Sequence, residues 1–147
     1  MSFKNIGSFR KRLKKRLGKN PDKNLSRALQ DAVSLVQSEV ISSISKQGTG
    51  IVYPRPWKDH HASKPGSPPA TDTGTLRNSI TTRIVRENDA LIGQIIAYAP
   101  DGGGGNYAKH LEFGTRRGLK ARPFMQPALD KSAKKIKQAF KSRGIIR

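Results

Sequence analysis

Three histidines are the side chains of this sequence best suited to metal binding or proton transfer. His60 and His61 are adjacent and follow Asp59, whereas His110 lies far along the chain. Adjacent residues of a strand point to opposite faces, and this spacing matches no zinc motif. We therefore expect His60 and His61 to be a polar pair in a loop, and we predict no metal site.

A run of glycines, Gly102–Gly105, has the composition of a loop that cradles a phosphate with its backbone N–H groups. It is followed by Asn106 and Tyr107, whereas a phosphate-binding loop continues with Gly-Lys and then Ser or Thr. It also does not open a recognisable dinucleotide-binding unit. We interpret the run as a flexible connector that needs permissive backbone angles, and we expect no cofactor.

Catalytic side chains are scarce in the rest of the sequence. There is no cysteine, which removes thiolate nucleophiles, thiolate metal ligands and disulfides. The serines form no Gly-x-Ser-x-Gly elbow and no Ser-x-x-Lys motif in a plausible context. The ten acidic residues offer no evident acid–base pair, since Glu87 and Asp89 fall in a predicted turn. We predict that the protein is not an enzyme and has no small-molecule substrate.

The formal net charge of +19 is concentrated at the two ends of the 147-residue chain. Residues 1–27 hold ten basic residues and one acidic, residues 116–147 hold eleven and one, and residues 28–115 hold eight of each. Basic ends on a neutral middle are typical of a module whose ends meet nucleic acid or an acidic patch of another subunit. The alternative is that they only keep an assembling protein soluble.

Lysines and arginines near both ends are the candidate contacts to DNA or to an acidic partner. They are Lys11, Arg12, Lys14, Lys15, Arg16, Lys134, Lys135 and Lys137. Few aromatic residues accompany them, whereas modules that read sequence or bind single strands stack bases on aromatic side chains. We therefore expect non-specific contact with the DNA backbone rather than sequence recognition.

Helical periodicity marks three segments. Residues 3–17 predict a basic amphipathic helix that ends at Gly18, and residues 22–45 predict a long helix that stops before Gly48. A last helix is predicted to begin near Pro127 and to end at Gly144. Its apolar stripe is predicted to consist of Leu129, Ala133, Ile136 and Phe140.

The middle of the chain predicts a loop and a hairpin. Five of the nine prolines fall within residues 53–70, which excludes a helix or a central strand there and favours a long interaction loop. Residues 76–85 and 90–99 predict an antiparallel hairpin joined across residues 86–89. Residues 107–113 are short enough to be either a helical turn or a strand.

The order of these elements predicts an α+β fold, a small antiparallel sheet packed against the long helix and the C-terminal helix. We expect a basic helical extension at residues 1–20 and a single domain at residues 21–147 that contains the Pro-rich loop. The longest apolar stretch, residues 90–99, is interrupted by Gly93 and Gln94, and the first residues lack an apolar leader. We therefore expect a soluble, cytoplasm-made protein without a membrane partner.

Two longer stretches carry a more specific pattern. Residues 63–80 run from a Pro-rich segment into Asp-Thr-Gly-Thr-Leu-Arg-Asn-Ser-Ile. Residues 107–129 hold Tyr-Ala-Lys-His-Leu-Glu-Phe-Gly-Thr, followed by Ala-Arg-Pro-Phe-Met-Gln-Pro-Ala. In this order, and with the long helix before them, they resemble the tail-component family of tailed bacteriophages, small neck and tail-completion proteins. The basic segment before Asn20 and the glycine run after Pro100 depart from the family's pattern.

The resemblance implies a non-enzymatic virion structural protein at the head-proximal end of the tail or in the neck. It implies a homo-oligomeric ring, expected to be a hexamer that matches the tail tube, assembled in the host cytoplasm. The implied partners are the tail tube and the tail terminator or connector proteins, with non-specific contact between the basic ends and packaged DNA as a hypothesis. A small basic nucleic-acid-binding protein is the alternative.

The motifs of the resemblance supply the candidate interface residues. They are Asp72, Thr73, Gly74, Leu76, Tyr107, Glu112, Phe113, Gly114, Arg122, Pro123 and Phe124. We expect tight turns or close approaches at Gly74 and Gly114, a cap of a turn or of the next element at Asp72, and the start of a sheet face at Leu76 and Ile80. Arg122 to Phe124 predict an extended approach to the last helix, with Phe124 as an anchor and Arg122 as a partner for Glu112. These residues either contact neighbours or shape the fold.

Overall fold

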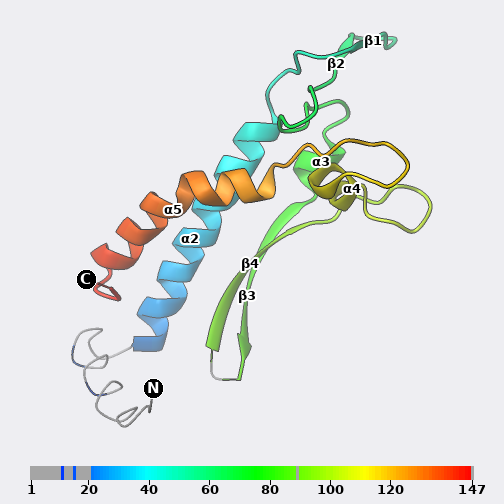
Figure 1. Ribbon diagram of the computed structural model, residues 1–147. Coiled ribbons are helices and arrows are strands. Elements are labelled where there is room, and N and C mark those ends of the chain that lie inside the picture. The colour runs from blue at the N-terminus through cyan, green and yellow to red at the C-terminus, as the bar shows by residue number, and fades with distance from the viewer. Residues whose placement is uncertain (1–10, 12–14, 16–20, 89, 147) are drawn as a thin grey trace.

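The computed structural model describes residues 21–88 and 90–146, together with Lys11 and Lys15. The fold is α+β, as predicted, and Figure 1 shows its arrangement. In chain order the described elements are α2 (Pro21–Ile44), β1 (Val52–Tyr53), β2 (His60–His61), α3 (Thr75–Asn78), β3 (Ile80–Glu87), β4 (Ala90–Ala97), α4 (Tyr107–Phe113) and α5 (Met125–Ser142). The predicted helical extension at residues 1–20 lies outside the described residues, apart from Lys11 and Lys15, which are helical and exposed.

Helix α2 is the element against which both the β3–β4 hairpin and α5 pack. Its bounds agree with the predicted 22–45 to within a residue. The apolar residues three and four positions apart face inward and are buried: Ala28, Ala32, Val33, Val36, Val40 and Ile44. The Gln37 side chain donates a hydrogen bond of 3.0 Å to the carbonyl of Ile80, which ties the helix to the start of β3.

Strands β3 and β4 form the predicted antiparallel hairpin, in which Ile80 lies opposite Ala97 and Glu87 lies opposite Ala90. The pairing therefore continues beyond the expected end of the first strand and leaves a shorter turn than the predicted residues 86–89. Asn88 in this turn has a φ of 45°, a left-handed conformation that asparagine tolerates and that tight hairpin turns require.

One face of the hairpin lies against α2. Gly93 is the point of closest approach, because a Cβ placed there would lie only 2.6 Å from the Cγ1 atom of Val33. At the far end of the hairpin, Arg86 lies 3.6 Å from the carboxylate of Asp22 at the start of α2. The isolated hairpin would be marginal in water, so its packing on α2 is what stabilises it.

The predicted strand beginning at Leu76 is wrong at its start, because this segment forms the short helix α3. Gly74 has a φ of 83°, and its carbonyl accepts a hydrogen bond of 2.9 Å from the N–H of Asn78, which closes a helical turn. A left-handed glycine redirects the chain and prevents an extended run through this point. Leu76 consequently packs against the core instead of opening a sheet face.

The apolar stripe predicted for the last helix is right in its second half and wrong in its first. Ile136 packs against the core and Phe140 is half-buried. Phe124, just before α5, is 1% exposed, and Ala128 and Ser132 follow it at four-residue steps and are buried. Leu129 and Ala133, which the periodicity places in the stripe, are exposed. The buried Phe124 side chain fixes the rotation of the helix at its start, so Leu129 and Ala133 face outward there.

Helix α5 ends at Gly144, as predicted. The N–H of Gly144 donates to the carbonyl of Lys141 at 2.9 Å, and the N–H of Ile145 donates to the carbonyl of Phe140 at 3.0 Å. Gly144 has a φ of 69°. This combination is a Schellman motif, in which a left-handed glycine lets the last carbonyl groups of the helix find donors.

The core connects α2 with the hairpin, α4 and α5. Its buried members are Val36, Val40, Ile44, Ile80, Ala99, Ala108, Leu111, Phe124 and Ala128. The segment 107–113, for which helix and strand were both open, is the helix α4. No helix among the described residues has the length and apolar character needed to cross a membrane.

Candidate functional site

Residues 51–61, which we call the finger, project beyond the C-terminal end of α2 (Figure 1). The two short strands β1 and β2 pair here, with Val52 opposite His61 and Tyr53 opposite His60. The predicted proline-rich loop thus holds no helix and only short strand pairing. Trp57, in the loop between the two strands, is 93% exposed, and Ile51 is 69% exposed. Large apolar side chains exposed together in this way are typical of contact with another molecule.

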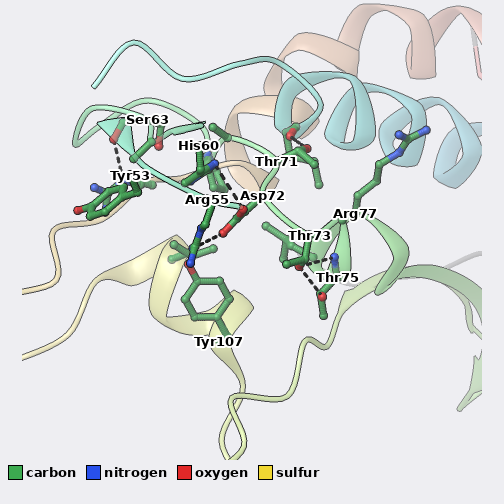
Figure 2. A pocket seen from close by; sticks show the side chains of 18 of the residues that line it. Tyr53, Arg55, His60, Ser63, Thr71, Asp72, Thr73, Thr75, Arg77 and Tyr107 are labelled. Carbon is green, nitrogen blue, oxygen red and sulfur yellow. Dashed lines mark hydrogen bonds and ion pairs between the residues drawn. The ribbon is translucent and has the colours of Figure 1, made fainter. Parts of the chain in front are cut away.

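Asp72 holds the loop between β1 and β2 of the finger in place. Its carboxylate lies 2.6 Å from the guanidinium of Arg55 and 3.9 Å from Nδ1 of His60, as Figure 2 shows. The His60 ring is in turn stacked on Tyr53 with ring centroids 6.3 Å apart. The prediction that Asp72 caps the next element is wrong: the N-cap of α3 is Gly74, without a side-chain hydrogen bond, because the Asp72 carboxylate faces Arg55 instead.

Arg122 fastens the return segment of the proline-rich loop. Its Nε donates to the carbonyl of Ser63 at 3.2 Å, and its Nη1 lies 3.4 Å from the carbonyl of Lys120. Beside it, the N–H of Gly66 donates to the carbonyl of Ala121 at 2.9 Å. Two motif residues far apart in the sequence, Asp72 and Arg122, therefore serve the same loop.

Two glycines at the root of the finger, Gly48 and Gly50, have a role that the sequence analysis did not predict. A Cβ on Gly48 would lie 2.2 Å from the carbonyl oxygen of Ala62, and one on Gly50 would lie 2.8 Å from it. Their N–H groups donate to the carbonyls of His61 and Ala62 at 3.0 and 2.7 Å. The two passes of the loop can approach this closely only where a side chain is missing.

Glu112 caps helix α5. Its Oε2 atom accepts hydrogen bonds from the N–H groups of Phe124 at 2.8 Å and Met125 at 3.0 Å, and its Oε1 accepts from Gln126 at 3.2 Å. The predicted pairing of Glu112 with Arg122 is therefore wrong. A helix N-terminus presents free N–H groups and a partial positive charge, and here these compete successfully for the carboxylate.

Gly114 ends α4 in a conformation that other residues resist. Its φ is 74°, and a Cβ there would lie 2.7 Å from the carbonyl oxygen of Leu119. The N–H of Thr115 donates to the same carbonyl at 2.9 Å, which closes the loop that follows. The expected close approach at Gly114 is confirmed, and Phe113 beside it is 75% exposed.

The remaining motif residues lie at the starts of α3, α4 and α5. The Thr73 hydroxyl accepts a long hydrogen bond of 3.4 Å from the N–H of Thr75 and lies 2.8 Å from the hydroxyl of Thr75. Tyr107 begins α4 and, together with Leu111, lines a cavity of about 340 Å³ at the base of the finger. Pro123 lies in the segment that leads to α5 and is half-buried.

An apolar groove of about 720 Å³ opens on the other side of α4, between β4, α4 and the start of α5. Most of its lining is apolar: Val36, Gly93, Ile95, Ala97, Ala108, Phe113, Phe124, Met125 and Leu129. Asn106, Lys109, Glu112 and Gln126 complete it. Phe113 and Leu129 are largely exposed, so the groove reaches the surface with apolar walls.

The glycine run folds around Asp101. The carboxylate accepts hydrogen bonds from the N–H groups of Gly103 at 2.9 Å and Gly105 at 2.8 Å. These two bonds, and less strongly the nearby His110, hold the pKa of Asp101 below its ordinary value. The N–H groups that a phosphate would need are thus engaged by a carboxylate of the same loop.

Asn106 is a further residue whose role the sequence analysis missed. Its side-chain oxygen accepts from the N–H of Ala108 at 3.1 Å and of Ala99 at 3.2 Å, and its amide donates to the carbonyl of Ala97 at 3.0 Å. It joins the end of the hairpin to α4. Its position just before a helical segment, where asparagine is a preferred N-cap residue, is the one feature of the sequence that indicates this role. Within the described part of the chain, no group of three or more His, Asp or Glu side chains could hold a metal ion.

The basic candidates lie on exposed surface. Lys134, Lys135 and Lys137 are exposed on α5 and have no carboxylate partner among the described residues. Their neighbour Lys131 differs, since it lies 3.5 Å from Glu39 of α2. Lys11 and Lys15 are also exposed, whereas Arg12, Lys14 and Arg16 lie outside the described residues.

Comparison with known proteins adds one match. The family described as bacteriophage HK97-gp10 tail component matches residues 7–114, which include α2, the finger, the hairpin and α4. No curated protein and no solved structure matches the chain.

Proposed function

The chain belongs to the HK97-gp10-like family of bacteriophage tail components, and from this premise we propose that it is a tail-completion or neck protein. It forms a ring at the head-proximal end of the tail, where it joins the tail to the connector. Its role is structural and non-enzymatic. It is assembled in the host cytoplasm and remains in the virion.

One observation carries the ring proposal: exposed large apolar residues gather at two unlike places on one chain. Trp57 and Ile51 lie on the finger, whereas Phe113 and Leu129 lie at the groove on the other side of α4. Soluble monomers rarely expose contiguous apolar surface of this kind. A contact between two different surfaces of identical chains is heterologous, and repeated around an axis it closes into a ring.

The ring has the symmetry of the tail tube, for which we propose six copies. The tail tube and the tail terminator or connector proteins are its neighbours along the tail axis. The motif residues that clamp the finger and cap α5 keep the two apolar surfaces in position, so they support the ring from within each subunit.

Quantitative mass spectrometry of purified virus particles tests this proposal. We expect the chain in finished particles, at a small fixed number of copies relative to the major tail protein and consistent with one ring. Particles that lack the chain would overturn the structural role and favour an assembly factor or a nucleic-acid-binding protein. When the virus is assembled without this chain, negative-stain microscopy should show tails without heads attached.

Contact with packaged DNA is a second proposed function, and it rests on the exposed face of α5. Lys134, Lys135 and Lys137 are exposed there without carboxylate partners in the described chain. Uncompensated lysines on one helix face are suited to phosphate groups and carry no means of reading bases. In a ring that encloses the DNA path, such a face would line the channel.

Salt dependence separates this function from ring assembly. Replacing Lys134, Lys135 and Lys137 by Gln should weaken binding to duplex DNA and lower the slope of log Kd against log salt by up to about 3. Ring assembly should be unchanged, because the three lysines neither line the groove nor belong to the finger. Replacing Lys131, which is paired with Glu39, is the matched control. Equal DNA affinity of the triple variant and the unaltered chain would refute the DNA contact.

A further inference from the structure

The finger is held as a preformed structure, although its apolar side chains touch solvent. The loop between β1 and β2 is fixed by the ion pair of Arg55 with Asp72 at 2.6 Å, and the root of the finger by the hydrogen bonds of Gly48 and Gly50 to the carbonyls of His61 and Ala62. Trp57 has no such role, since it is 93% exposed. Exposing an indole on a fixed scaffold is unfavourable in water, and a preformed loop loses little entropy when it docks. These two properties suit an anchor for another molecule.

The groove offers a matching receptor on the same chain. Its volume of about 720 Å³ is ample for one aromatic side chain and its neighbours, and its walls carry Phe113 and Leu129. Lys109 lies in the lining, exposed and without a carboxylate partner in the described chain. Asp59, two residues after Trp57, is also exposed and forms no ion pair within the described chain.

The finger and the groove of one chain are separated by α4. Tyr107 and Leu111 of this helix line the cavity at the base of the finger, whereas Lys109 and Glu112 of the same helix line the groove. The finger is tied to Asp72, just before α3, and the loop segment after it is tied to the segment before α5, so the finger stays on its own side of α4. The finger of the same chain therefore does not fill the groove.

We propose that the groove receives a second copy of the chain, whose finger places Trp57 in the groove and Asp59 beside Lys109. This inference rests on the proposed ring and names its contact. Trp57 alone contributes about 200 Å² to it, since this side chain is 93% exposed. A standard interface buries about 800 Å² on each partner, so Trp57 supplies roughly a quarter of one. It is the anchor of the contact, and adjoining surface completes it.

The absence of cysteine makes the contact testable by cross-linking. A Trp57→Cys chain mixed with a Leu129→Cys chain should give a disulfide-linked dimer under mild oxidation. The double variant should give a ladder of cross-linked species that ends at the size of the ring. Tyr98→Cys replaces Leu129→Cys in the control, because Tyr98 is similarly exposed but does not line the groove, and this pair should give no dimer.

Loss-of-contact variants give an independent measurement by analytical ultracentrifugation. Trp57→Ala and Phe113→Ser should each raise the Kd of self-association about 30-fold, the effect of removing a central anchor. Both side chains are so exposed that the melting temperature should not change. The two variants mixed together should form a dimer that cannot extend, because each retains the surface that the other has lost. Tyr98→Ser should assemble like the unaltered chain.

The outcomes separate this inference from the proposed function, and the cross-linking is done both on purified protein and on assembled particles. If Trp57→Ala still forms rings, and rings of the double-cysteine variant lack the cross-link between positions 57 and 129, the finger contact is overturned and the ring stands. A chain that stays monomeric at every concentration and is missing from particles would overturn both. Cross-links at the predicted pair, with none at the control pair, would support both.

Discussion

The cap that Glu112 places on α5 is open to a direct test by Glu112→Gln. In the carboxylate, one oxygen serves the N–H groups of Phe124 and Met125 and the other serves Gln126. An amide keeps one oxygen, so on one side an NH2 group would face N–H donors. The variant also loses the attraction between the negative charge and the helix N-terminus.

The expected size of the effect follows from these losses. One charge-assisted hydrogen bond contributes about 1.5–3 kcal/mol, and the interaction of a charge with the helix terminus contributes about 0.3–1 kcal/mol. Part of the hydrogen bonding survives in the amide, so we expect a loss of about 2 kcal/mol in the free energy of unfolding. For a chain of this size, this corresponds to a fall in melting temperature of about 4–8 °C.

Urea denaturation monitored by circular dichroism measures this loss, and amide hydrogen exchange locates it. Protection should fall first at the N–H groups of residues 124–126, before the rest of α5. Glu87→Gln is the matched control, because Glu87 is exposed at the end of β3 and forms no ion pair within the described chain. If both variants lose the same stability to within about 0.5 kcal/mol, the capping argument is refuted.

Three further predictions concern the finger, the end of α4 and the glycine run. Asp72→Asn should weaken the ion pair with Arg55 and speed amide exchange in β1 and β2, with little change in global stability, since the pair is partly exposed. Gly114→Ala should lower the free energy of unfolding by about 1–3 kcal/mol in urea titrations, because its φ of 74° and the nearby carbonyl of Leu119 both oppose a Cβ. The lowered pKa of Asp101 means that the folded glycine run favours the carboxylate form. The contribution of this carboxylate to the stability of the folded state is present above about pH 4 and is lost as the pH falls through the folded pKa. The amide signals of Gly103 and Gly105 should report that loss in an NMR titration, and an unchanged pair of signals at low pH would contradict it.

The elements that the sequence predicts well are those with a strong local signal. The apolar residues of α2 recur at helical spacing over many turns, and the structure places its bounds at Pro21 and Ile44. Gly144 ends α5 because a left-handed residue is needed locally. Leu76 shows where local patterns fail to predict an element. Its β-like neighbours favour a strand, whereas the left-handed Gly74 imposes a turn that depends on tertiary packing.

The candidate site was less predictable because its key contacts join distant parts of the chain. Opposite charges at Glu112 and Arg122 favour a pair in the sequence, yet the free N–H groups at the start of α5 are invisible there. The closeness of Gly48 to Ala62 is likewise a property of two passes of the loop. Local residue types indicate which groups need partners, and only the fold decides which partners are within reach.

Substitutions of the residues that clamp the fold and substitutions of the exposed residues should therefore impair assembly in different ways. Asp72 and Glu112 form their contacts inside the chain, where they hold the finger and the start of α5. Trp57 and Phe113 hold nothing within it, because both are largely exposed. A finger without its clamp is more mobile and loses more conformational entropy when it docks. Weakening the clamp therefore lowers the affinity of self-association without removing any intermolecular contact. The most specific part of the sequence pattern thus prepares the proposed assembly surface and supplies Phe113 to it, while Trp57 lies outside the pattern.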